Sequence, residues 1–229
     1  MREIYMDNAA ARSVLPEVLE AMSPYYREFY GNPQSLHRFG AEPAEALARA
    51  RKEVAALIGA SPEEIFFTSS GSESNNMAIK GLALANQDRG RHIVVSAIEH
   101  HSVLHSCKHL EKFGFDVTQV PVDSEGIVSP EALRNVLKDD TILVSVMHGN
   151  NEVGTVQKLS ELSRLARQSR AVFHTDGVAT VGMIPAMVDE LGVDALSMAA
   201  QNFYGPKGAA ALYLRKGTRI VPFMDGGVQ

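Results

Sequence analysis

The sequence has a single cysteine, no long uncharged apolar run and no dense basic segment, and each shortage excludes a class of protein. One cysteine, Cys107, rules out an internal disulfide and fits a reducing compartment. The first ten residues, MREIYMDNAA, carry charged and polar groups where a signal peptide needs an apolar core. No stretch long enough to cross a bilayer is free of charge. We therefore expect a cytoplasmic protein that does not enter a membrane.

The charge balance argues against a nucleic-acid partner. The chain has 22 Lys and Arg residues against 27 Asp and Glu, a formal net charge of -5, and its basic residues are too dispersed to follow a phosphate backbone. With 229 residues, of which 45% are hydrophobic, it can bury a sizeable core and form one large globular domain. A small-molecule ligand is the partner that this composition favours.

Apolar runs of strand length alternate with amphipathic stretches of helical spacing. The strand-like runs cover residues 64–70, 92–99, 116–122, 141–148, 171–176, 195–200 and 209–215, and the helical stretches cover 41–60, 102–114, 129–138 and 158–170. This alternation predicts an α/β fold, a mostly parallel sheet sandwiched by helices. Residues 1–40, rich in aromatic and turn residues, are expected outside the sheet as an N-terminal segment that packs beside the main domain of residues 41–229.

Polar residues follow several of the predicted strands. They are Ser70-Gly71-Ser72, Glu99-His100, Asn150-Asn151-Glu152, Asp176 and Gln201-Asn202. Open parallel sheets bind ligands beyond the carboxyl ends of their strands, so we expect a site where these residues converge. The segment at 70–72 also precedes a helix, where backbone N–H groups and hydroxyls suit a phosphate. Ordinary helix capping explains the same residues, and both explanations stay open here.

Seven segments, in this order, resemble those of the cysteine desulfurases, pyridoxal-phosphate enzymes of fold type I in the class V aminotransferase group. They are YMDNAA, YGNPQSLHRFG, EIFFTSSGSESNN, SAIEHHSV, HGNNEVGTVQ, HTDGVATVG and FYGPKGAAALYLRKG. The resemblance implies a cofactor site in which Ser70, Gly71 and Ser72 hold the phosphate, His100 stacks on the pyridine ring, Asn151 reaches the ring hydroxyl and Asp176 pairs with the ring nitrogen. A carboxylate there keeps the ring protonated, and an imidazole can also move a proton.

The stretch LSMAAQNFYGPKG departs from this family. Where the family has a serine, a histidine and the lysine that forms the Schiff base, this chain has Ala199, Gln201 and Asn202. The lone pair of a carboxamide nitrogen is delocalised, so Asn202 cannot replace that amine. Ala179 stands where the family has a glutamine that donates to the ring oxygen. The family carries a lysine at the position of Lys207 in addition to its anchor, so we do not expect Lys207 to take over.

The sequence ends at MDGGVQ, before the region that, by the resemblance, holds the substrate-binding arginine, the loop with the persulfide-forming cysteine and the small domain. Cys107 is expected to be a buried helical thiol and no replacement for that cysteine. We therefore expect a protein without desulfurase activity of its own.

Several readings of the function remain open. The chain is a noncovalent pyridoxal-phosphate binder or assembly subunit, a piece of a split or longer enzyme that a partner chain completes, a structural protein with a relic cofactor site, or an enzyme that uses the free cofactor. Expected partners are a second copy of the chain, a complementing chain, or a sulfur-transfer or iron-sulfur scaffold protein.

Three histidines recur at four-residue spacing in HHSVLHSCKHL. His101, His105 and His109 would lie along one face of a helix, where adjacent pairs suit a transition metal. No carboxylate or thiol completes an obvious site, and we expect no metal to be bound.

Overall fold

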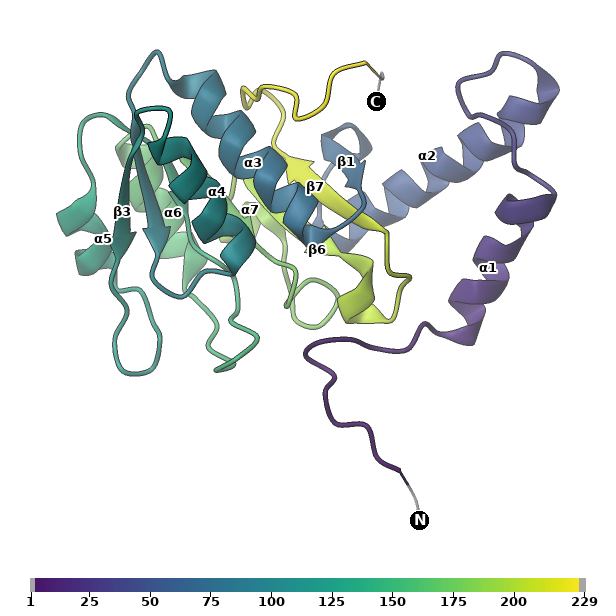
Figure 1. Cartoon of the computed structure of the whole chain (residues 1–229), viewed down its shortest axis with the longest axis horizontal. Coiled ribbons are helices and arrows are strands. Elements are labelled where there is room, and N and C mark those ends of the chain that lie inside the picture. The colour runs from purple at the N-terminus through teal and green to yellow at the C-terminus, as the bar shows by residue number, and fades with distance from the viewer. Residues whose placement is uncertain (1–2, 227–229) are drawn as a thin grey trace.

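Seven strands form a single sheet between two layers of helices in the computed structural model, which describes residues 3–226 (Figure 1). The strand order is β1-β7-β6-β5-β4-β2-β3; β7 pairs antiparallel with both β1 and β6, and the other neighbouring pairs are parallel. The strands are β1 (Ile65–Thr68), β2 (His92–Ser96), β3 (Asp116–Val120), β4 (Thr141–Ser145), β5 (Val172–Asp176), β6 (Ala195–Ala199) and β7 (Ala210–Leu214). Each lies within one of the seven predicted runs, so the predicted fold class is confirmed.

The helices cover both faces of this sheet. They are α1 (Pro16–Arg27), α2 (Arg38–Ile58), α3 (Gly71–Asn86), α4 (His101–Glu111), α5 (Pro130–Val136), α6 (Leu159–Gln168) and α7 (Val188–Leu191), with short 3-10 helices η1 (Pro62–Glu64) and η2 (Ala200–Phe203). One hydrophobic cluster joins α3 and α4 to the sheet, and a second joins α2, α5, α6 and α7 to it. The four helices predicted from spacing all form, with ends displaced by a few residues.

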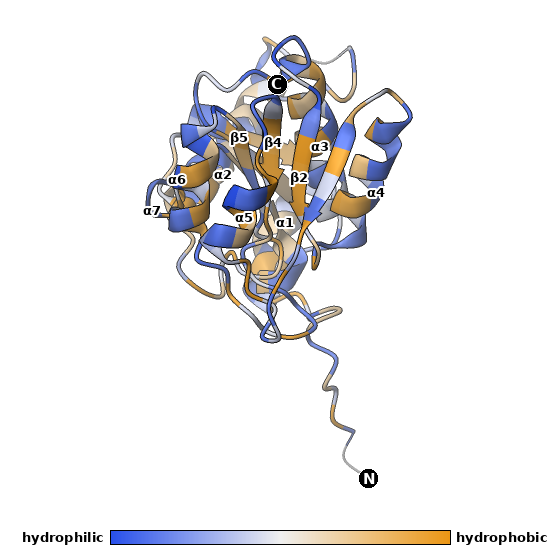
Figure 2. Cartoon of the chain, turned by 90° about the vertical axis from the view of Figure 1, so that its left-hand side faces the viewer, coloured by the Kyte–Doolittle hydropathy of each residue, from blue (hydrophilic) through white to orange (hydrophobic). Residues whose placement is uncertain are grey.

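Burial on both faces explains why the strands read as continuous apolar runs. Every residue of β2, β4, β6 and β7 is buried, whereas the edge strand β3 exposes Asp116 and Gln119. Figure 2 shows this apolar centre between helices whose outer sides are polar. Among residues 3–226, no helix combines the length and the apolar character needed to cross a bilayer.

The N-terminal segment lies outside the sheet, as predicted (Figure 1). It contains α1, a helix that the sequence analysis did not anticipate and that buries none of its residues. Large apolar side chains remain exposed on this segment and on α2, among them Met6, Tyr26, Leu36 and Phe39. Helix α2 passes through residue 40 without interruption, and the domain division proposed there stays a prediction.

Candidate functional site

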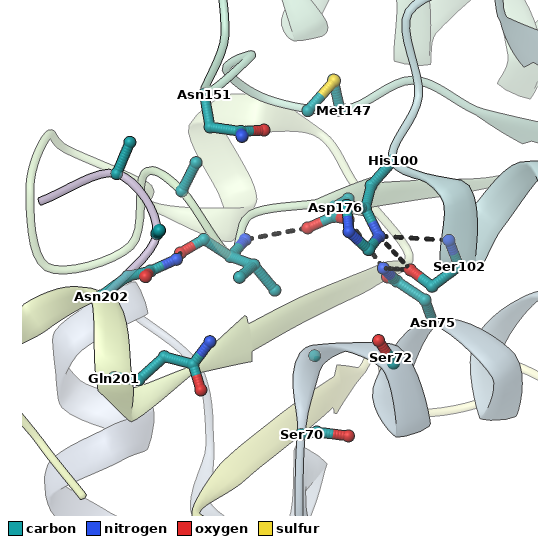
Figure 3. Close-up of a pocket in the computed structure, with 15 residues that line it drawn as sticks. Ser70, Ser72, Asn75, His100, Ser102, Met147, Asn151, Asp176, Gln201 and Asn202 are labelled. Atoms are coloured by element: carbon teal, nitrogen blue, oxygen red, sulfur yellow. Dashed lines mark hydrogen bonds between the residues drawn. The ribbon is translucent and has the colours of Figure 1, made fainter. Parts of the chain in front are cut away.

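A cavity of about 260 Å³ lies where the polar strand ends converge (Figure 3). Its walls come from the start of α3, the start of α4, the loop after β4, the turn after β5, η2 and the N-terminal segment. The lining residues are Ala9, Ala10, Ser70, Gly71, Ser72, Asn75, His100, Ser102, Met147, Asn151, Asp176, Val178, Ala179, Gln201 and Asn202. Nine of the ten residues predicted for the cofactor site are in this set. The tenth, Ala199, is buried at the end of β6 and does not line the cavity.

The start of α3 presents backbone N–H groups to the cavity. Ser70 caps the helix, since its hydroxyl accepts from the backbone N–H of Glu73 at 3.1 Å. The next two N–H groups, of Gly71 and Ser72, have no acceptor within the helix. A Cβ atom on Gly71 would lie 2.5 Å from Cγ2 of Val178, so only glycine fits at this close approach. The 16-residue helix therefore directs free donors and its positive end toward this space.

Asp176 ends β5 and places a buried carboxylate at the cavity. Its side chain accepts two hydrogen bonds, one at Oδ2 from Nδ2 of Asn75 at 2.7 Å and one at Oδ1 from the backbone N–H of Val178 at 3.0 Å. Burial raises the pKa of Asp176 because it removes water from the charged form, while the two donors oppose that rise. The carboxylate is thus held in one orientation and would gain from a cationic partner.

A chain of hydrogen bonds connects this carboxylate to His100 (Figure 3). The second N–H of the Asn75 amide donates to Oγ of Ser102 at 2.8 Å, so the Ser102 hydroxyl has its own proton to donate. That hydroxyl lies 2.7 Å from Nδ1 of His100, and the backbone N–H of Ser102 donates to the same nitrogen at 3.1 Å. Nδ1 is therefore an acceptor, and the neutral His100 ring carries its proton on Nε2.

Sequence reasoning missed Asn75 and Ser102. Asn75 is almost fully buried on the sheet side of α3, and its Oδ1 has no partner among the described residues. A polar residue on the apolar side of a helix was the available signal. Ser102 stands two residues after His100, the spacing of a local side-chain cap.

The two amides at the proposed anchor position lie on η2. Nδ2 of Asn202 donates to the backbone carbonyl of Val178 at 2.8 Å, which ties η2 to the turn after Asp176. Gln201 lies beside it at the cavity rim (Figure 3). Lys207 is exposed in the following turn and does not line the cavity.

Glu99 is a buried acid in contact with a residue of the cavity wall. Its Oε1 accepts from Oγ of Ser96 at 2.5 Å and from the backbone N–H of Met147 at 2.6 Å. Burial is the main cause that raises the pKa of Glu99 to about 8, partly opposed by these two donors. The sequence placed Glu99 at the rim, but the structure buries it, where it positions Met147, a lining residue.

Cys107 and the three histidines of α4 lie apart from this chemistry. Cys107 is buried as predicted, and burial is the main cause that raises its thiol pKa to about 12, so the reactive thiolate is suppressed. The rings of His101 and His105 stack with centroids 5.3 Å apart on the exposed side of the helix. Within residues 3–226, no group of three His, Cys, Asp or Glu residues is placed to hold a metal ion.

Comparisons with known proteins agree with the fold. The family model for class V aminotransferases matches residues 4–229. The whole chain is 54% identical to a cysteine desulfurase IscS from Dictyoglomus turgidum and 50% identical to one from Methanosarcina thermophila. The chain spans 58% and 56% of the lengths of these two relatives.

Solved structures extend the similarity to three dimensions. A NifS-like protein superposes on 99% of this chain with a TM-score of 0.96 at 43% identity, and the match covers 62% of that protein. The apo structure of a cysteine desulfurase from Thermococcus onnurineus NA1 gives a TM-score of 0.89 at 31% identity, covering 98% of this chain and 57% of that one. The chain therefore belongs to the class V aminotransferase family and has the fold of its cysteine desulfurases.

Proposed function

We propose that this chain binds pyridoxal phosphate noncovalently and does not desulfurate cysteine on its own. The observation that carries the proposal is the buried Asp176 carboxylate at the cavity, fixed by Asn75 and Val178. An anion in that position favours a protonated pyridine ring. Burial raises the pKa of Asp176, so a cationic partner would offset the free-energy cost of burying its charged form.

The other lining residues fit the same ligand. Ser70, Gly71 and Ser72 at the start of α3 would hold the phosphate, because their free N–H groups and hydroxyls suit an anion. His100 presents a flat ring that Ser102 holds in one tautomer, and Asn151 supplies an amide. When bound, the cofactor supplies an aldehyde and an electron-accepting ring.

The proposed loss of activity depends on Asn202. Its amide nitrogen is not a nucleophile and is engaged with the carbonyl of Val178, so it can neither anchor an aldehyde nor move a proton. Ala179 and Ala199 supply no polar group in place of the side chains that the family resemblance leads us to expect. The chain keeps the means to bind the cofactor but lacks the base that would act on a bound amino acid.

A titration with pyridoxal phosphate, followed by visible absorption, tests cofactor binding. The informative variant is Asp176→Asn, which keeps the shape and removes the charge. We expect it to bind at least about tenfold more weakly, since a charge-assisted contact contributes about 1.5–3 kcal/mol. Asp88→Asn, an exposed aspartate paired with Arg219, is the matched control and should bind like the parent. Equal affinity in both variants would contradict the proposal, and absence of binding to the parent would favour the relic-site interpretation.

We also propose that a second chain covers part of this protein. The support is the exposed apolar surface of the N-terminal segment and α2, which includes Tyr26, Leu36 and Phe39. The partner is a second copy or a chain that supplies the remaining length of the relatives, in a cytoplasmic setting of sulfur transfer or iron-sulfur assembly. Light scattering should show an oligomer, and a monomer at high concentration would contradict this.

A further inference from the structure

We propose that Arg12 is the anion-binding residue of a carboxylate subsite that adjoins the cofactor cavity. A second cavity, of about 260 Å³, lies next to the first and shares four lining residues with it, Ala9, Asn151, Ala179 and Asn202. The two cavities therefore adjoin each other. The assignment rests on the proposed function, because it gives the neighbouring cavity to the cofactor.

The Arg12 side chain is held in place by several contacts. Its guanidinium carbon lies 5.1 Å from the centre of the Tyr204 ring, and its Nε donates to the backbone carbonyl of Asn8 at 3.3 Å. Nη1 donates to Sδ of Met183 at 2.7 Å. These contacts orient the Arg12 guanidinium before a ligand binds, which lowers the conformational entropy lost on binding.

None of these contacts neutralises the Arg12 charge. Throughout residues 3–226, no carboxylate lies within ion-pair distance of Arg12, and Nη2 has no hydrogen-bond partner. The residue is half-buried and lines the second cavity. A partly desolvated guanidinium with unused donors is suited to the two oxygens of a carboxylate.

The remaining walls of the second cavity indicate which carboxylates fit. Met183, Ile184 and Val156 give an apolar side, while the polar side-chain atoms of Asn150 and Thr180 are engaged in hydrogen bonds within the protein. A volume of about 260 Å³ suits a ligand smaller than a typical drug-sized molecule. The ligand class is thus a small carboxylate with a short uncharged side chain, such as an amino acid whose amine faces the cofactor cavity.

Nuclear magnetic resonance of the Arg12 Nε–Hε group provides a direct test. The probe is propionate, compared with the uncharged isostere propionamide at constant ionic strength, and neither experiment requires activity. We expect a saturable shift of this signal with propionate and none with propionamide. Ligand-detected titration should show that Arg12→Gln weakens propionate binding by about tenfold or more. The control is Arg38→Gln, which removes an arginine that also packs on an aromatic ring, Phe39, and lies outside the cavity.

A second variant guards against simple misfolding of the N-terminal segment. Val156→Trp puts a bulky side chain into the second cavity and leaves Arg12 unchanged, so it should also abolish the shift. No shift in the parent, or equal propionate affinity in the parent and Arg12→Gln, would overturn the subsite. Propionate binding that survives Val156→Trp would overturn its location.

The same samples titrated with pyridoxal phosphate separate this inference from the proposed function. Cofactor binding without propionate binding contradicts the subsite alone. Propionate binding at Arg12 without cofactor binding supports the subsite and contradicts the proposed function.

Discussion

Replacing Asn75 by alanine tests the hydrogen-bond chain beneath the cavity. Asn75 Nδ2 gives one proton to Asp176 at 2.7 Å and the other to Ser102 at 2.8 Å, from a side chain that is only 1% exposed. The substitution leaves Oδ2 of Asp176 without a donor. Asp176 then keeps a single donor, the backbone N–H of Val178.

The size of the effect follows from these contacts. A hydrogen bond to a charged group contributes about 1.5–3 kcal/mol and one to a neutral hydroxyl about 0.5–1.5 kcal/mol. The substitution also removes Oδ1 of Asn75, a buried acceptor without a partner, and burying such an atom costs about 1–3 kcal/mol. Its removal therefore offsets part of the loss of stability. We expect the free energy of unfolding to fall by about 1–3 kcal/mol at pH 8.

The pH dependence distinguishes this mechanism from loss of packing. The pKa of Asp176 is raised in the folded state, so its contribution to stability declines as pH rises from the unfolded pKa to the folded one. Asn75→Ala removes a donor to the charged form and raises that pKa further. Its cost should therefore be about 1 kcal/mol smaller at pH 4 than at pH 8, because a larger share of the carboxyl is protonated at the lower pH.

Urea unfolding at pH 4 and pH 8 provides the measurement. The matched control is Asn86→Ala on the same helix, since Asn86 is also buried, donates to the carbonyl of Leu82 at 2.8 Å, accepts from Nη1 of Arg89 at 3.3 Å and contacts no carboxyl group. Its cost should not depend on pH. Equal costs of Asn75→Ala at the two pH values would refute the account of Asp176.

Three further predictions use single side chains. The pKa of Glu99 is raised to about 8 in the folded state, so the free energy of unfolding of the parent should fall as the pH rises from 4.5 to about 8. Urea unfolding of Glu99→Gln should lack this fall, and the same pH dependence in parent and variant would contradict the raised pKa of Glu99. Cys107, with a thiol pKa of about 12, should react with a disulfide reagent only after unfolding, whereas rapid reaction of the folded protein would show an open thiol. Gly71→Ala should weaken pyridoxal-phosphate binding because its Cβ meets Val178 at 2.5 Å, and adding Val178→Ala should restore it; no effect of the first change, or no rescue by the second, would show that this contact is unimportant.

The sheet was predictable because its strands are buried on both faces and read as apolar runs of strand length. The carboxyl ends of those runs also located the cavity, since polar residues follow them directly. Helix α1 was not predicted because its segment is rich in aromatic and turn residues and carries Pro24 inside the helix, a residue that normally interrupts one.

The site residues that were not predicted make contacts between secondary-structure elements that are far apart in the sequence. Asn75 and Asp176 lie 101 positions apart, and their contact depends on how α3 crosses the end of β5. Glu99 appeared to be a rim residue, because its position after a strand does not reveal that it turns inward to Met147. The cofactor roles of His100, Asn151 and Asp176 stay predictions.

Mass spectrometry before and after borohydride reduction, on protein saturated with pyridoxal phosphate, tests noncovalent binding most directly. Reduction makes a bond between the cofactor and a lysine permanent, so the parent should show no added mass while its absorption titration shows binding. Asn202→Lys supplies the missing amine at the cavity and should gain a reducible adduct on residue 202. An adduct on Lys207 or another lysine of the parent would contradict the account.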